Sequence, residues 1–219
     1  MRGDVYAHAW ENKKSGKKGY SPVCNNEWRD GVCFKPKVKC ADCSHQSFLP
    51  FDEKAAIAHL TGKTLIGSYA INSDDMCSFL AADFDKGNWK EDALCYKQVG
   101  NELGVDIAIE ISKSGNGAHC WIFFNELVSA RDARVFGLII LTRAQEKSST
   151  YKLESYDRFF PNQDFIPKGG RADLVILLRY PYKRDIEITT HQFLLTHHLI
   201  HCYINGNTSL TSIFSLKRT

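Results

Sequence analysis

Two aspartates stand two residues apart at the end of an apolar run, in the stretch SFLAADFDKGNW. The run predicts a β-strand, and side chains two residues apart on a strand point to the same side of it. Asp83 and Asp85 should therefore converge on one point while Phe84 turns into the core. Two hard oxygen ligands suit Mg²⁺ or Mn²⁺, which complete their coordination shell with water and substrate phosphate. The alternative is a solvated strand end or a helix cap, because D-x-D alone is a common pattern.

A second stretch, SKSGNGAHCW, has the residues of an anion-binding turn. Gly115 and Gly117 allow a tight turn whose backbone N–H groups can hold an anion. Ser114 adds a hydroxyl and Lys113 adds a positive charge, and His119 opens the next predicted strand. A histidine in this place can hydrogen-bond a triphosphate. Without the aspartate pair, a hairpin turn followed by a packed histidine would be the better interpretation.

A third acidic ligand would complete a metal site, and the stretch ESYDRFFPNQD offers Asp157 and Asp164. Their positions in the sequence do not choose between them. Polymerases and nucleases use such carboxylates to hold two metal ions about 4 Å apart, one on the attacking oxygen and one on the leaving oxygen.

Four cysteines lie close together near the N-terminus: Cys24, Cys33, Cys40 and Cys43. The last two form C-A-D-C, a spacing at which two thiolates can bind one tetrahedral ion. Residues 1–50 show little apolar periodicity, so a structural Zn²⁺ would supply folding energy that this segment lacks. His8 and His45 are spare ligands, and the alternative is a set of unrelated reduced cysteines.

The composition fits one substantial core, or a core with a small appended module: 219 residues, of which 43% are hydrophobic. The net charge of +3 suggests a polyanionic partner only weakly, although basic residues are concentrated between Lys13 and Lys39. The first residues lack a signal peptide's apolar segment, and no run approaches the ~20 apolar residues of a membrane span. We therefore expect a cytoplasmic protein without membrane contact. In that reducing compartment, simple burial is expected for the scattered cysteines Cys77, Cys95, Cys120 and Cys202.

Regular elements are predicted from residue 51 onward. Helices are expected at residues 52–62, 88–104 and 129–147, the last with Ser129 as its cap and Asp132 three residues on. Strands are expected at residues 64–71, 77–85, 105–112 and 120–124. This order predicts an α+β core with a mixed sheet and flanking helices.

Taken together, the motifs resemble the archaeo-eukaryotic primase superfamily, in which D-x-D on a strand is followed by S-G-x-G-x-H on a hairpin and then by a further acidic residue. The chain is more similar still to one branch, the primase domain of TOTE conflict systems. The resemblance rests on DVYAHAWENKKSGKKGYSPVCNNEW, FLAADFDK, SKSGNGAHCWIFF and ESYDRFFPNQDFIPKGG, and it runs from about Asp4 to Gly170.

This resemblance implies an RRM-like catalytic core and assigns roles within it. Asp83 and Asp85 would be the metal-binding motif, and Ser114 and His119 the nucleotide-phosphate motif. The implied reaction is nucleotidyl transfer, in which a 3′-hydroxyl attacks the α-phosphate of an incoming nucleotide and pyrophosphate leaves. Two metal ions stabilise the charge while basic residues hold the template phosphates.

The third motif acid would fall in YDRFFPNQD, where Asp157 is preferred over Asp164 because it follows an apolar-rich approach. The four N-terminal cysteines match those of the family's N-terminal knuckle. The resemblance thus implies structural Zn²⁺ in addition to Mg²⁺ or Mn²⁺.

The resemblance stops after Gly170, where the family continues with a segment like GFGNLIALPLQ. Synonymous codons can be chosen for residues 171–183 that, read from their third base, encode GRFGNLIALPLQ. We therefore expect three segments: a basic zinc-knuckle segment at 1–50, an incomplete primase–polymerase core at 51–170, and a divergent tail at 171–219 that is translated out of frame. An inactive, truncated remnant is one expected outcome.

The leading hypothesis is a primase–polymerase domain of a TOTE conflict system, which defends against mobile elements. Its partners would be a DNA or RNA template and primer, NTPs or dNTPs, and the helicase and nuclease components of such systems. Two alternatives remain: a two-metal nuclease using the same aspartates, and a non-enzymatic zinc-containing fragment that binds nucleic acid.

Overall fold

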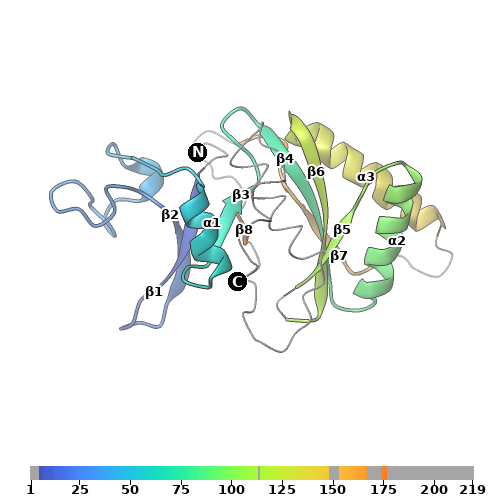
Figure 1. Ribbon diagram of the computed structural model, residues 1–219, viewed down its shortest axis with the longest axis horizontal. Coiled ribbons are helices and arrows are strands. Elements are labelled where there is room, and N and C mark those ends of the chain that lie inside the picture. Colours follow the sequence, from blue (N-terminus) through green and yellow to red (C-terminus); the bar gives the residue numbers. More distant parts are fainter. Residues whose placement is uncertain (1–4, 113, 148–152, 167–173, 177–219) are drawn as a thin grey trace, which may run out of the picture.

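The computed structural model describes residues 5–112, 114–147, 153–166 and 174–176 of the chain. Within these residues the protein consists of two four-stranded β-sheets with α-helices packed beside them, as Figure 1 shows. The α+β class expected from the sequence is confirmed. The rest of the expected out-of-frame tail, residues 171–173 and 177–219, lies outside the described residues.

The first sheet has the strand order β2-β1-β3-β8. Its strands are β1 (Tyr6–Glu11), β2 (Lys18–Pro22), β3 (Ile66–Tyr69) and β8 (Leu174–Ile176). Helix α1 (Glu53–Leu60) belongs to this half of the molecule, and its N-terminus is capped by the Asp52 side chain, which accepts a hydrogen bond from the Ala55 backbone N–H at 2.8 Å. A single turn of 3₁₀-helix, η1 (Cys40–Asp42), lies in the long connection between β2 and α1.

The second sheet has the order β5-β6-β4-β7 and carries the predicted motifs. Its strands are β4 (Met76–Asp85), β5 (Ala108–Ile111), β6 (Gly117–Ser129) and β7 (Tyr156–Phe160). Two long helices pack on its outer side, away from the first sheet: α2 (Trp89–Glu102) and α3 (Ala130–Lys147) (Figure 1).

Strand β4 has two buried faces of different composition. Leu80, Ala82 and Phe84 belong to the large core under α2 and α3. Phe79 and Ala81 point the other way, into a smaller core shared with α1 and β3. Because side chains alternate along a strand, Asp83 and Asp85 continue this second face beyond the point where apolar packing ends. The aspartates are thus carried by a strand held firmly on both sides.

The expectation of a mixed sheet is wrong for the described strands, because each pair of neighbouring strands is antiparallel. The sequence order strand–helix–strand from β4 through α2 to β5 suggested a parallel pair. Strand β6 inserts between β4 and β5 and pairs antiparallel with both, so those two strands run in the same direction without being neighbours. This arrangement is a split βαβ unit.

Strands β1 and β2 were not indicated by the sequence, which showed little periodicity in residues 1–50. The two strands form a hairpin in which Ala9 pairs with Tyr20, and β1 also pairs with β3. The alternation of apolar and polar residues is weak because few side chains in this hairpin are buried. Strand β2 is an edge strand with one buried residue, and the buried side chains in and just before β1 are those of Val5 and Ala7.

The remaining predicted elements are present, with shifted ends. Ser129 caps α3 as expected, since its hydroxyl accepts a hydrogen bond from the Asp132 backbone N–H at 3.0 Å. Gly104, with a φ of 78°, follows the end of α2. Strand β6 is far longer than predicted and runs straight into α3. In the described part of the chain, no helix has the length and apolar character needed to cross a membrane.

The contact between α3 and the sheet is testable at Gly137. A Cβ at this position would stand 2.6 Å from Leu80 Cδ2 and 3.0 Å from the Phe159 ring. Gly137→Val should therefore lower the free energy of unfolding by about 1–3 kcal/mol through overpacking. Thr142→Val, at an exposed position on the same helix, should change it by less than about 0.5 kcal/mol. Urea unfolding measures both, and equal effects would contradict this packing.

Candidate active site

The two motif aspartates lie at the end of β4, as predicted, with Phe84 between them fully buried in the core. Asp83 pairs across the sheet with His119 and Asp85 pairs with Gly117, so the aspartate motif and the glycine–histidine motif are in register. The Asp83 side chain is 21% exposed and that of Asp85 is 47% exposed. Asp83 is therefore the inner ligand candidate and Asp85 the outer one.

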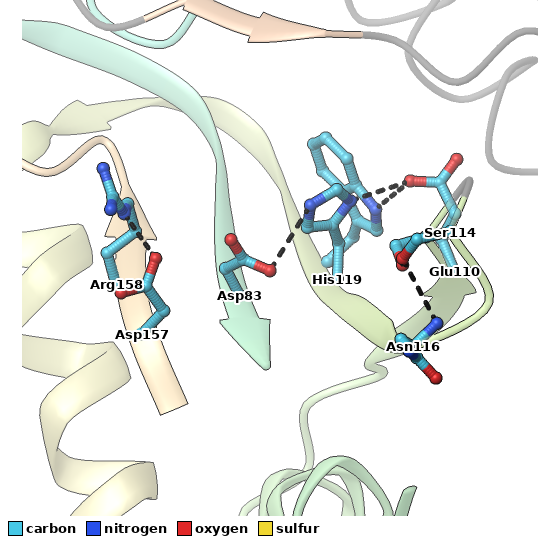
Figure 2. Close-up of polar contacts among 9 residues, drawn as sticks. Asp83, Glu110, Ser114, Asn116, His119, Asp157 and Arg158 are labelled. Atoms are coloured by element: carbon cyan, nitrogen blue, oxygen red, sulfur yellow. Dashed lines mark hydrogen bonds and ion pairs between the residues drawn. The ribbon is translucent and has the colours of Figure 1, made fainter. Parts of the chain in front are cut away.

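A bulge in β7 brings Asp157 to this site. Asp83 pairs with Arg158 and Phe84 pairs with Tyr156, which leaves Asp157 as the extra residue on β7. Tyr156 packs edge-on against Phe84 on the core side of the sheet. Two β7 residues therefore face Asp83, and the Arg158 Nε donates to Asp157 Oδ2 at 2.8 Å (Figure 2).

Asp164, the other candidate for a third acidic ligand, lies elsewhere. Its carboxylate forms an ion pair with the Arg134 Nε of α3 at 2.9 Å. Helix α3 covers the opposite face of the sheet from Asp83. The structure thus brings Asp157, and not Asp164, together with the β4 aspartates.

The turn between β5 and β6 has the tight geometry expected of the glycine motif. The Gly115 backbone N–H donates to the Ser112 carbonyl oxygen at 2.9 Å, and Gly115 has a φ of 74°, which favours glycine. The Ser114 hydroxyl accepts from the Asn116 backbone N–H at 3.2 Å and lies 3.0 Å from the Ser112 hydroxyl. Lys113, expected to add positive charge here, lies outside the described residues.

His119 connects the aspartate end of β4 with β5. Its Nε2 is 3.6 Å from Asp83 Oδ1, and its Nδ1 is 3.4 Å from Glu110 Oε2 (Figure 2). Burial lowers the pKa of His119, but the hydrogen bond and charge of Glu110, together with the charge of Asp83, outweigh burial and leave that pKa above its usual value. The histidine is therefore flanked by a carboxylate on each side.

The electrostatics around Asp83 favour a cation. Burial raises the pKa of the Asp83 carboxyl; His119 and Arg158 act against this, whereas the charges of Asp157 and Asp85 raise it further. Three carboxylates from two adjacent strands are hard oxygen donors facing one region, which is the donor set that Mg²⁺ or Mn²⁺ prefers. In the described part of the chain, no group of three or more aspartate, glutamate, histidine or cysteine side chains is gathered closely enough to hold a metal ion.

Three residues that surround the aspartates were not identified from the sequence: Ser155, Glu110 and Arg158. Ser155 sits directly before β7, and its hydroxyl and backbone N–H both donate to buried Asp92 Oδ2, at 2.6 and 3.2 Å. The Ser155 carbonyl accepts from the Asp85 backbone N–H at 2.7 Å. Helix α2 thereby ties the approach of β7 to the end of β4. No local pattern signals this contact, whereas Glu110 and Arg158 could have been found from strand alternation.

The four N-terminal cysteines line one cavity, together with His45. The Sγ of Cys43 accepts a hydrogen bond from the His45 backbone N–H, and the Sγ of Cys24 accepts one from Ser47, each at 3.4 Å. Cysteine sulfurs that line one cavity are the donor type that a tetrahedral Zn²⁺ site uses. Among the scattered cysteines, Cys77 and Cys120 are buried as expected, whereas Cys95 is only partly buried. Burial raises the pKa of the Cys77 thiol to about 12, and Cys202 is outside the described residues.

The chain belongs to the family of archaeo-eukaryotic primase domains of TOTE conflict systems, whose model matches residues 1–185. This places it in a class of primase–polymerase nucleotidyltransferase folds, and the match continues past Gly170 into the tail. Among solved structures, the polymerase domain from Mycobacterium tuberculosis ligase D in complex with DNA is similar, with a TM-score of 0.44 and 14% identity over 80% of this chain and 68% of that chain. No curated protein matches the chain.

The glycine motif can be tested by two alanine substitutions. A Cβ at Gly117 would stand 2.6 Å from the Phe84 carbonyl oxygen, whereas a Cβ at Gly115 would meet nothing within 4 Å. Gly117→Ala should therefore shift the backbone amide resonances of Phe84 and Asp85, because the backbone itself must move. Gly115→Ala should strain only the turn, at about 1–2 kcal/mol. Two-dimensional NMR makes the comparison, and unchanged β4 resonances in Gly117→Ala would contradict the close approach.

Proposed function

We propose that this domain is a template-dependent nucleotidyltransferase of the primase–polymerase type. The observation that carries the proposal is that Asp83 and Asp85 on β4 lie in register with the glycine–histidine motif on one side and next to the Asp157 bulge of β7 on the other. Family membership supports it, since the match spans both motifs. We extend the proposal to a role in a TOTE conflict system, acting on DNA or RNA in the cytoplasm beside helicase and nuclease components.

The described residues divide the work of nucleotidyl transfer between them. Asp83, Asp85 and Asp157 would hold Mg²⁺ or Mn²⁺, which supplies charge stabilisation for the attacking and leaving oxygens when bound. The Ser114 hydroxyl lies on the exposed turn that leads to Gly117, the residue paired with Asp85, and it can donate to a nucleotide phosphate. The Nε2 of His119 is directed at the same region.

The reaction that this site supports joins a primer 3′-hydroxyl oxygen to the α-phosphorus of an incoming nucleotide. The bond from that phosphorus to the bridging oxygen breaks, pyrophosphate leaves, and the hydroxyl proton passes to solvent. The chain's own contribution is to position the phosphates and concentrate negative charge where cations are needed. Arg158, 52% exposed and beside Asp157, adds positive charge at the rim of the site.

We also propose that the cavity lined by the four N-terminal cysteines holds a structural Zn²⁺. Thiolates suit Zn²⁺, and the four cysteines line this one cavity together with His45. The η1 turn in this region has no buried residue, so apolar packing there contributes little. Metal binding would contribute the missing stability.

The catalytic proposal is tested by primer synthesis and extension with NTPs or dNTPs and Mn²⁺, using the full chain. Asp83→Asn, Asp85→Asn or Asp157→Asn should each lower the rate at least about 100-fold, since metal-based charge stabilisation is worth several kcal/mol and each ~1.4 kcal/mol is a tenfold change in rate. Asp164→Asn is the matched control and should stay within about threefold, because its partner is Arg134 on the other side of the sheet.

Two outcomes would contradict this function, and a third would contradict the assignment of Asp157. Cleavage of nucleic acid without added nucleotide would show a two-metal nuclease that uses the same aspartates. Salt-sensitive binding that is unaffected by Asp83→Asn, with no product, would show a non-enzymatic nucleic-acid-binding protein. Loss of activity in Asp164→Asn equal to that in Asp157→Asn would show that the third ligand is misassigned.

The zinc proposal predicts about one Zn²⁺ per chain in purified protein, measured by elemental analysis. Removing it with a chelator should speed hydrogen exchange in residues 24–48 and leave β4 and β6 protected, because metal binding orders only the segment that supplies the ligands. Cys40→Ser should lose the metal, whereas Cys95→Ser, on α2 and half-buried, should retain it. Zinc-free protein with native protection at residues 24–48 would refute a structural role.

A further inference from the structure

Glu110 lies beside the candidate active site but has no part in the reaction described above. It stands on β5 directly opposite His119 of β6, and its side chain is only 13% exposed. Alternation along β5 turns Glu110 to the same sheet face as Asp83. A largely buried carboxylate in this position must have partners that offset its desolvation.

Those partners are two rings of β6 that share one oxygen. The Trp121 indole Nε1 donates to Glu110 Oε2 at 3.0 Å, and His119 Nδ1 lies 3.4 Å from the same oxygen (Figure 2). Trp121 is 1% exposed and is fixed by parallel stacking on Phe123, at a centroid distance of 5.9 Å. A buried indole N–H requires an acceptor, and the Trp121 ring is held in place by its neighbours. Its hydrogen bond therefore fixes the position of the Glu110 carboxylate.

The carboxylate in turn limits how the His119 ring can be turned. The ring stands edge-on to Trp121, with an interplanar angle of 80°. When Nδ1–H donates to Glu110, the opposite nitrogen, Nε2, is left facing Asp83, 3.6 Å away. An imidazole whose one nitrogen is hydrogen-bonded to a carboxylate has a fixed orientation at the other nitrogen.

We propose that Glu110 is a positioning residue that acts through His119: it accepts the Nδ1–H and aims Nε2 at the nucleotide phosphates. The effect of Glu110 on catalysis rests on the proposed nucleotidyl transfer, whereas the Glu110–His119 contact does not depend on it. The competing explanation is a purely structural one, in which Glu110 serves only to satisfy the Trp121 indole.

Three variants, one of them conservative, distinguish the two explanations. Glu110→Ala removes the acceptor for both rings. Glu110→Gln keeps an amide oxygen that can accept from the indole, but a neutral acceptor forms a hydrogen bond about half as strong as a carboxylate does. Glu126→Ala, at an exposed position on β6, is the matched control for loss of a glutamate from the same sheet.

In nucleotide incorporation, Glu110→Ala should lower kcat/KM by about 10- to 100-fold, with partial recovery in Glu110→Gln. In a His119→Ala background, the same substitution should change kcat/KM by less than about twofold, because a residue that acts through His119 has nothing left to position. Equal losses in the two backgrounds would overturn the proposal. Glu126→Ala should match the wild type.

A second measurement does not depend on activity. The His119 Nδ1–H should give a slowly exchanging proton resonance in the wild type, identified by its loss in His119→Ala. That resonance should disappear in Glu110→Ala and persist, shifted, in Glu110→Gln. If it is unchanged in Glu110→Ala, the proposal is wrong even when primers are extended. If the wild type shows the resonance but extends no primer, the proposed function fails and the Glu110–His119 contact is retained.

Discussion

The antiparallel pairing of β4 with β6 is the constraint on which the site depends. This register places Asp83 opposite His119 and Asp85 opposite Gly117, so the two motifs meet although they lie far apart in the sequence. A slip of one residue would turn each aspartate to the helix side of the sheet, into an apolar core. Packing of Leu80, Ala82 and Phe84 under α2 and α3 prevents that slip.

The two faces of the β5-β6-β4-β7 sheet have different roles: one packs the core that stabilises the domain, and the other carries the candidate site. One face carries the large apolar core under α2 and α3. The other is apolar only as far as Ala81 and Trp121, where α1 and β3 cover it, and it becomes charged beyond them. Carboxylates gathered at this boundary are costly for the folded protein, as the raised pKa of Asp83, caused first by burial, indicates. A bound cation would offset that cost, which couples the function of the site to its electrostatics.

The N-terminal region depends less on the burial of apolar side chains. Its first two strands join the sheet that contains β3 and bury Ala7. The cysteine-containing connection after them has few buried side chains, and its sulfurs line a common cavity instead. Where a segment cannot bury enough apolar surface, metal–thiolate bonds are the usual substitute. The two halves of the protein thus differ in the side-chain donors that they offer, carboxylate oxygens at the end of β4 and cysteine sulfurs near η1.

The sequence by itself determined the elements with strong periodicity and the residues with distinctive chemistry. The D-x-D strand, the glycine turn and the cap at Ser129 are local features, set by side-chain alternation and by hydrogen bonds between residues a few positions apart. Tertiary structure alone decided the rest. It placed β6 between β4 and β5, placed Asp157 in a bulge opposite Asp83, and paired Asp164 with Arg134. These outcomes depend on contacts between strands and helices distant in the chain, whose packing energies no local pattern contains.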